Sequence, residues 1–132
     1  MRAAAVATLF FAYLFAATLA AIGAQALKGG NAEAAKLTNP VAITPESIAA
    51  GKRMYQRMCA RCHGPSGKGD GSGTAVPSDL TDETWEFGSS DGEVFTAISD
   101  GTSIDMDGYA GRISDTEIWN LVNFLRSIGP QK

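Results

Sequence analysis

Cys59-Ala60-Arg61-Cys62-His63 is the stretch that decides the fold of this chain. It separates two thiols by about one helical turn and places an imidazole directly after them. This C-x-x-C-H pattern is typical of c-type haem attachment, in which the two thiols add across the two vinyl groups of the porphyrin. The motif uses both cysteines and the only histidine of the chain. We therefore expect one covalent haem c on Cys59 and Cys62, with His63 as an iron ligand.

Other uses of the two cysteines fit the sequence less well. A structural zinc site needs four Cys or His ligands, and the chain has only three such residues. A thioredoxin-like dithiol requires a βαβ context, which the sequence does not indicate. A disulfide between Cys59 and Cys62 would close too small a loop to stabilise the fold much.

The composition agrees with a small cofactor protein. A chain of 132 residues indicates one small domain with additional segments. Aromatic residues make up 8% of the chain, so the protein core is modest and a buried porphyrin would add apolar volume. The formal charge of −3 argues against nonspecific nucleic-acid binding.

The N-terminal residues 1–26 have the pattern of an export or membrane segment. Arg2 precedes an apolar run from Ala3 to about Ala24, and Ala24-Gln25-Ala26 offers an A-x-A cleavage site. The first interpretation is a signal peptide. The second is an uncleaved anchor, because about 20 apolar residues span a bilayer. Both predict a periplasmic location, with membrane contact through residues 3–24 only if the segment is retained.

The remaining chain divides at about residue 43. Residues 27–43 contain Gly29, Gly30 and Pro40 without an apolar period, so we expect a flexible linker. Residues 44–132 are expected to form the haem domain.

Three helices are predicted from start and stop signals. Thr44 and Pro45 begin the first helix, which runs into Cys59. A Ser-x-x-Glu capping box at Ser90 begins a helix over about 91–99, and another at Ser114 begins a helix that ends before Gly129-Pro130.

The segments between these helices are less regular. A short helical stretch is expected at 82–87 and a loop at 102–111. The Gly-rich segment 64–73 lacks the G-x-x-x-x-G-K-[ST] pattern of a phosphate loop, so we expect it to wrap a cofactor edge. No segment shows strand alternation. The predicted fold class is all-α: a small helical domain around one covalent haem, preceded by an N-terminal apolar segment.

A second iron ligand would distinguish an electron carrier from a ligand-binding haem protein. No second histidine exists, so a methionine is the candidate. Met54 and Met58 precede the motif closely, whereas Met106 lies in a remote polar loop from which it can reach the opposite face of the porphyrin. We expect Met106 to be the ligand. The alternative is a methionine that only packs at the edge of the fold.

The chain from about Ser47 to Ile128 resembles the small class I monohaem cytochromes c of bacteria. The resemblance rests on the order of these stretches: Gly-Lys-Arg-Met-Tyr, Cys-Ala-Arg-Cys-His-Gly-Pro-Ser-Gly-Lys-Gly-Asp-Gly, Pro-Ser-Asp-Leu-Thr-Asp, Ile-Ser-Asp-Gly-Thr, and Ile-Ser-Asp-Thr-Glu-Ile-Trp-Asn-Leu-Val-Asn-Phe-Leu-Arg-Ser-Ile. One position departs from the family, because Asp107 follows Met106 where the family commonly has proline.

The resemblance implies both a helix crossing and a ligand set. It implies that Gly51 and Tyr55 on the first helix pack against Leu121 and Phe124 on the last. It also implies that His63 and Met106 are the axial ligands. The carbonyl of Pro77 would accept the ring N–H of His63 and so orient the imidazole.

The sequence therefore predicts a one-electron carrier that is not itself an enzyme. It would act between redox protein partners, as a soluble shuttle or as an anchored subunit of a membrane respiratory or dehydrogenase complex. The alternative is a ligand-binding or peroxidatic monohaem protein with a labile sixth ligand.

The charges along the chain bear on how partners approach. Five basic residues lie between Lys52 and Lys68 with no acid among them, whereas twelve acids and one base lie from Asp70 to Glu117. This separation is consistent with steering of a partner. It is equally consistent with solvated helix faces.

Overall fold

The structure is a computed structural model that describes residues 29–73, 77–103 and 105–130. The predicted signal peptide or anchor at residues 1–26 lies outside the described residues. Among the residues that are described, no helix is both long enough and apolar enough to cross a membrane.

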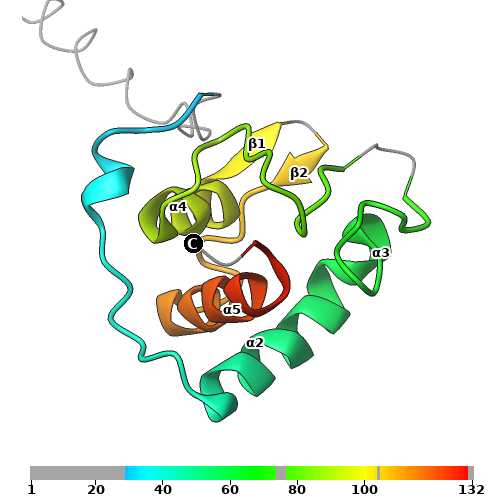
Figure 1. Ribbon diagram of the computed structural model, residues 1–132, viewed down its shortest axis with the longest axis horizontal. Coiled ribbons are helices and arrows are strands. Elements are labelled where there is room, and N and C mark those ends of the chain that lie inside the picture. The colour runs from blue at the N-terminus through cyan, green and yellow to red at the C-terminus, as the bar shows by residue number, and fades with distance from the viewer. Residues whose placement is uncertain (1–28, 74–76, 104, 131–132) are drawn as a thin grey trace, which may run out of the picture.

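Helices dominate the described chain, as predicted (Figure 1). In chain order the elements are the 3-10 turn η1 (Ala34–Lys36), α2 (Pro45–Met58), α3 (Ala60–His63), α4 (Asp91–Asp100), β1 (Gly101–Ser103), β2 (Met106–Asp107) and α5 (Asp115–Ile128). The small antiparallel β1–β2 pair begins one residue before the expected loop at 102–111 and pairs Ser103 with Met106. The all-α fold class is confirmed, with this hairpin as an addition.

The expected helical stretch at 82–87 is wrong. The Asp82 carboxylate accepts the N–H of Thr84 at 2.7 Å, and the Asp82 carbonyl accepts the indole N–H of Trp85 at 3.1 Å. An Asp side chain that bonds to the backbone two residues on forms a turn instead of a helix. The segment from Asp82 to Gly88 is therefore irregular.

All three predicted helix starts are confirmed by their caps. The Thr44 side chain accepts the N–H of Ser47 at the start of α2. At α4 and α5, Ser90 and Ser114 each form a reciprocal capping box with the glutamate three residues later. These boxes satisfy N–H groups that a helix start leaves without intrahelical partners.

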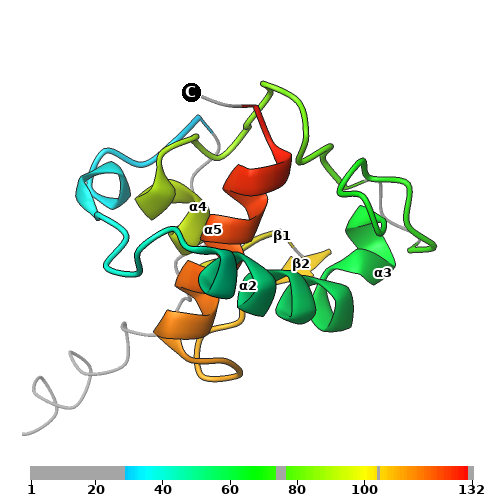
Figure 2. The same cartoon turned by 60° about the horizontal axis from the view of Figure 1, so that its bottom comes forward.

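Helices α2 and α5 cross at Gly51 and, together with α4, form the core (Figure 2). A Cβ at Gly51 would overlap the Asn120 carbonyl oxygen and lie 2.8 Å from the Cβ of Phe124. The Tyr55 and Phe124 rings pack with centroids 5.1 Å apart. The predicted crossing is confirmed, with Asn120 and Phe124 nearest to Gly51. Only a residue without a side chain allows the two backbones to approach this closely.

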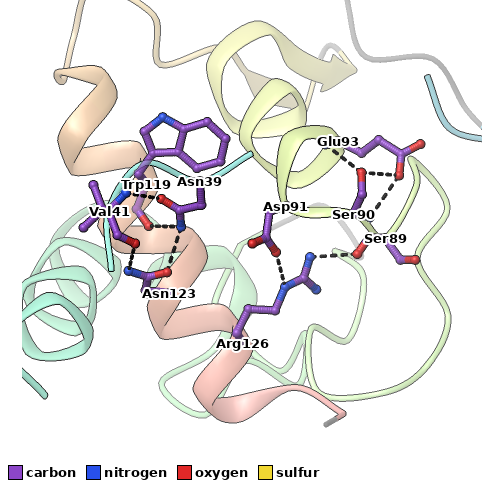
Figure 3. A network of polar contacts seen from close by, with 9 residues as sticks. All are labelled: Asn39, Val41, Ser89, Ser90, Asp91, Glu93, Trp119, Asn123 and Arg126. Atoms are coloured by element: carbon purple, nitrogen blue, oxygen red, sulfur yellow. Dashed lines mark hydrogen bonds and ion pairs between the residues drawn. The ribbon is translucent and has the colours of Figure 1, made fainter. Parts of the chain in front are cut away.

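Residues 29–43, here called the N-terminal strap, run along α4 and α5 to the start of α2 (Figure 1). Ala34 is buried, and the Asn39 amide donates to the Asn123 side-chain oxygen at 2.7 Å (Figure 3). The Asn123 amide in turn donates to the Val41 carbonyl at 3.2 Å. The expectation of a flexible linker does not describe these residues, because they have long-range hydrogen-bond partners that the sequence did not reveal.

Candidate haem site

A cavity of about 450 Å³ lies beside the Cys59–His63 motif. Its walls come from α2, α3, α4, α5, the β1–β2 hairpin and the irregular segment after Pro77. The predicted site residues that line it are Cys59, Cys62, His63, Pro77 and Met106. Residues far apart in the sequence thus converge on one cavity, which is in the size range of cofactor pockets.

The motif folds as a short helical continuation of α2. Cys59 caps α2 by donating its N–H to the Tyr55 carbonyl at 2.8 Å, and its own carbonyl accepts the N–H of His63 at 3.0 Å. Both thiols are free and half-buried. Burial, with a smaller contribution from the neighbouring Cys62, raises the pKa of Cys59 to about 11. The thiol of Cys59 is therefore protonated at neutral pH.

The His63 ring is oriented by a main-chain carbonyl, but not by the one expected. Its Nδ1 lies 3.3 Å from the Ser78 carbonyl oxygen. The Pro77 carbonyl instead lies against the Gly-rich loop, where a Cβ at Gly69 would be 2.5 Å from it. The expected acceptor is thus replaced by the next residue, while Pro77 still lines the cavity. An Nδ1–H that donates to Ser78 leaves the Nε2 lone pair free to bind a metal.

Burial also favours the form of His63 that a metal needs. Desolvation lowers the pKa of His63, and the contact with Ser78 opposes this shift. A neutral imidazole is the ligand form for iron.

Two of the methionines weighed as distal ligands line the cavity, Met58 and Met106. Met54 is buried in the core, and its sulfur accepts a hydrogen bond from Arg57 at 3.4 Å. Met58 adjoins Cys59, and its carbonyl accepts the Tyr109 hydroxyl at 3.2 Å. Met106 is half-buried on β2, where its N–H donates to the Ser103 hydroxyl at 3.3 Å.

Several lining residues were not found from the sequence. Tyr109 lies under the Arg112 guanidinium, 4.7 Å from the ring centroid, and both line the cavity. Thr84, Glu86, Phe87 and Gly88 form another wall. These residues lie in irregular segments without a hydrophobic period, so no pattern in the sequence marked them.

The donor set fits haem c. Two free thiols and an imidazole with a free Nε2 come from α3 and its junction with α2, and Met106 lines the cavity from β2. The remaining walls include apolar side chains such as Leu80, Val94, Ile98 and Leu121. Cysteine thiols for covalent attachment and a His/Met pair for the iron are the donors that c-type cytochromes use.

Comparison with known proteins identifies the family of the chain. Residues 46–125 match the model of the family described as cytochrome c oxidase, cbb3-type, subunit III. Over 84 residues, the chain is 31% identical to the cbb3-type cytochrome c oxidase subunit FixP of a Bradyrhizobium species, covering 64% of this chain and 28% of that protein. The chain thus corresponds to less than a third of the length of that relative.

Two solved structures share the fold. A reducing HAO-like protein complex of Kuenenia stuttgartiensis matches with a TM-score of 0.65 and 28% identity, covering 73% of this chain and 49% of that one. Cytochrome cL of Methylophaga aminisulfidivorans matches with a TM-score of 0.58 and 24% identity, covering 64% of this chain and 57% of that one. Because the family match spans more than half of the chain, the chain belongs to the cbb3-type cytochrome c oxidase subunit III family and is a monohaem, class I c-type cytochrome domain with covalent haem c and an electron-transfer role.

Proposed function

We propose that this chain is an exported one-electron carrier whose haem c is attached through Cys59 and Cys62 and whose iron is held by His63 and Met106. The observation that carries the proposal is the convergence of these four side chains on one cavity. Haem c, when bound, supplies an iron that alternates between the ferric and ferrous states.

The chain's own residues attach, orient and enclose the cofactor. Cys59 and Cys62 supply the thiols, and the Ser78 carbonyl fixes the ring of His63. Ser103 holds the backbone of Met106. Apolar side chains such as Leu121 and Val94 exclude water from the cavity. An enclosed site of this kind changes little in structure between oxidation states, which suits electron transfer.

The partners are proposed to be proteins of a membrane respiratory chain. The relative FixP is named as a subunit of a cbb3-type oxidase, which supports an assembly of that class. The apolar run at residues 3–24 would tether the domain if it is retained, and a cleaved signal peptide would release a periplasmic shuttle.

Covalent attachment is tested by denaturation in acid acetone followed by electrophoresis. Haem is expected to stay with the polypeptide, and the Cys59→Ala variant should mature poorly with one thioether at most. Haem that leaves the parent protein would refute the proposed attachment.

The distal ligand is tested with Met106→Ala. The parent should show the weak near-infrared charge-transfer band of a Met–Fe bond in the ferric state. The variant should lose this band, bind carbon monoxide in the ferrous state and have a lower reduction potential, because a methionine ligand raises the potential. Met58→Ala is the matched control, since Met58 also lines the cavity. If Met58→Ala alone removed the band, Met58 would replace Met106 as the ligand.

A further inference from the structure

The Glu93 carboxylate does more than cap α4. Its Oε2 accepts the Ser90 N–H at 2.9 Å, while the Glu93 N–H donates to the Ser90 hydroxyl oxygen at 3.3 Å, which is an ordinary capping box, and the Ser90 hydroxyl also donates to Oε2 at 2.7 Å. Its Oε1 accepts the N–H of Asn31 at 2.9 Å, from the N-terminal strap 62 residues away in the sequence. One carboxylate thus joins the start of α4 to the strap (Figure 3 shows the Ser90 side of this contact).

Two backbone segments close around this carboxylate. A Cβ at Gly30 would lie 2.6 Å from the Glu93 Oε1, and a Cβ at Gly88 would overlap the carboxylate. The strap is also bonded directly to the loop that ends at Gly88, because the Gly29 N–H donates to the Glu86 carbonyl at 2.6 Å. The strap, the loop and the start of α4 therefore meet at Glu93.

The loop held in this way is a wall of the haem cavity. The segment from Thr84 to Gly88 lines the cavity. Trp85 is placed from one side by the Asp82 carbonyl at 3.1 Å and from another by the Arg126 guanidinium, 5.4 Å from the ring centroid. Arg126 is itself held by Asp91 at 2.7 Å and by the Ser89 carbonyl at 2.7 Å (Figure 3). The contacts at Glu93 hold the other end of this wall, at Gly88.

We propose that Glu93 is a positioning residue of the haem pocket, which clasps the N-terminal strap to the wall formed by residues 84–88 and so controls how much water reaches the haem at this edge. The inference rests on the proposed haem site, since the wall matters to function only if haem fills the cavity. Exclusion of water from a haem favours the ferrous state, so a loosened wall lowers the reduction potential.

Glu93→Gln in the full-length holoprotein separates clasping from capping. A glutamine oxygen can still accept the Ser90 N–H, as in a Ser-x-x-Gln capping box. Its NH₂ group then faces the Asn31 N–H, and two donors cannot bond to each other. The matched control is Glu117→Gln, because Glu117 forms the same capping box with Ser114 at the start of α5, where its carboxylate accepts from Ser114 and not from the described strap residues.

Hydrogen exchange and potentiometry are measured on the parent and both variants. In Glu93→Gln, amides of residues 29–36 and 84–88 should exchange about tenfold faster or more, the size expected for one lost charge-assisted bond. The reduction potential should fall relative to the parent. In Glu117→Gln, both regions should exchange as in the parent and the potential should not move.

Each other outcome refutes a defined part of the proposal. Unchanged exchange in Glu93→Gln, or equal changes in both variants, would show that Glu93 is not a clasp. Faster strap exchange with an unchanged potential would show that the strap does not act on the pocket. A parent protein without covalent haem would instead refute the proposed function, while the exchange data would still decide whether the clasp exists.

Discussion

Helix α2 and the N-terminal strap both pack against α5, but different forces hold them there. The crossing is apolar and close-packed, with Tyr55 and Phe124 in ring contact and Gly51 directly against the Asn120 carbonyl. The strap is held mainly by hydrogen bonds, and the described residues' exposed large hydrophobics, Leu37 and Ile43, both lie in it or at its end. The crossing should therefore govern global stability. The attachment of the strap, measured by protection of its amides from hydrogen exchange, should weaken when a single polar group is lost.

The largest effect should come from a side chain at Gly51. Helix propensity alone favours alanine over glycine by about 1 kcal/mol, but even a Cβ would overlap the Asn120 carbonyl, which is backbone and cannot turn aside. Gly51→Val should therefore lower the free energy of unfolding by about 3 kcal/mol or more. Denaturant unfolding measures this loss. The control is Ala49→Val, at an exposed position of the same helix. If Gly51→Val and the control unfold at the same midpoint, the two helices do not cross at Gly51.

This contrast also explains what the sequence could reveal. The helix starts at Thr44, Ser90 and Ser114 follow local capping rules, so they were predictable from a few adjacent residues. The crossing was predictable because a mid-helix glycine and an aromatic one turn later match the family pattern. The Cys59–His63 motif likewise indicated the haem site, because its two thiols and its imidazole are close neighbours in the chain.

The strap and the pocket walls lacked such signals. Asn39 pairs with Asn123 across 84 residues, and no periodicity indicates a bond of that kind. Asp82 was expected to begin a helix, but its side chain closes a turn instead. The acceptor for His63 shifted by one residue to Ser78, because the path of an irregular segment depends on tertiary contacts. Local rules therefore predict elements, whereas long-range polar contacts require the fold.

The next effect should come from Asn123, which joins the strap to α5. Its side chain is fully buried, and its amide donates to the carbonyls of Val41 and Ala42 at 3.2 Å each. Asn123→Ala removes these bonds and the bond to the buried Ser47 hydroxyl, and it empties a fully buried site, so the free energy of unfolding should fall by about 2–3 kcal/mol. Protection of strap amides from hydrogen exchange should fall with it. Asn39→Ala, at a less buried partner, should cost less, and an equal loss would place the strap's main attachment at Asn39.

A smaller effect should come from Tyr55→Phe. This residue lies at the α2–α5 crossing, and its hydroxyl connects the crossing to the Gly-rich segment 64–73. The Tyr55 hydroxyl is buried and donates to the Gly64 carbonyl at 2.7 Å, directly after His63. Burial raises the pKa of this phenol to about 12, so it is a donor at all ordinary pH values. Its removal should cost about 1–2 kcal/mol in denaturant unfolding. Tyr109→Phe, whose hydroxyl is less buried and bonds at 3.2 Å, should cost less. If Tyr109→Phe lowered the free energy of unfolding more than Tyr55→Phe, the Tyr109 hydroxyl would be the more stabilising of the two.

The smallest expected effect is a pH dependence that separates the two capping boxes. Hydrogen bonds from Ser90, and then from Asn31, hold the pKa of Glu93 below its ordinary value of 4.5, and bonds from Ser114 do the same for Glu117. A carboxyl whose pKa is lower in the folded state stabilises the protein fully above the unfolded value. This stabilisation is lost as the pH falls through the lower folded value.

Unfolding midpoints measured from pH 7 to pH 3 should therefore decline below about pH 4.5 in the parent. The Asp79 carboxyl, whose pKa is lowered by Thr81, adds to the same decline. Glu93→Gln and Glu117→Gln should each flatten this decline, because glutamine does not titrate. Protection factors of the strap amides, which are exchange rates corrected for the intrinsic pH dependence of amide exchange, should fall with the pH in the parent and in Glu117→Gln, but not in Glu93→Gln. If the strap protection factors depended on the pH equally in all three proteins, the carboxylate that holds the strap would not be Glu93.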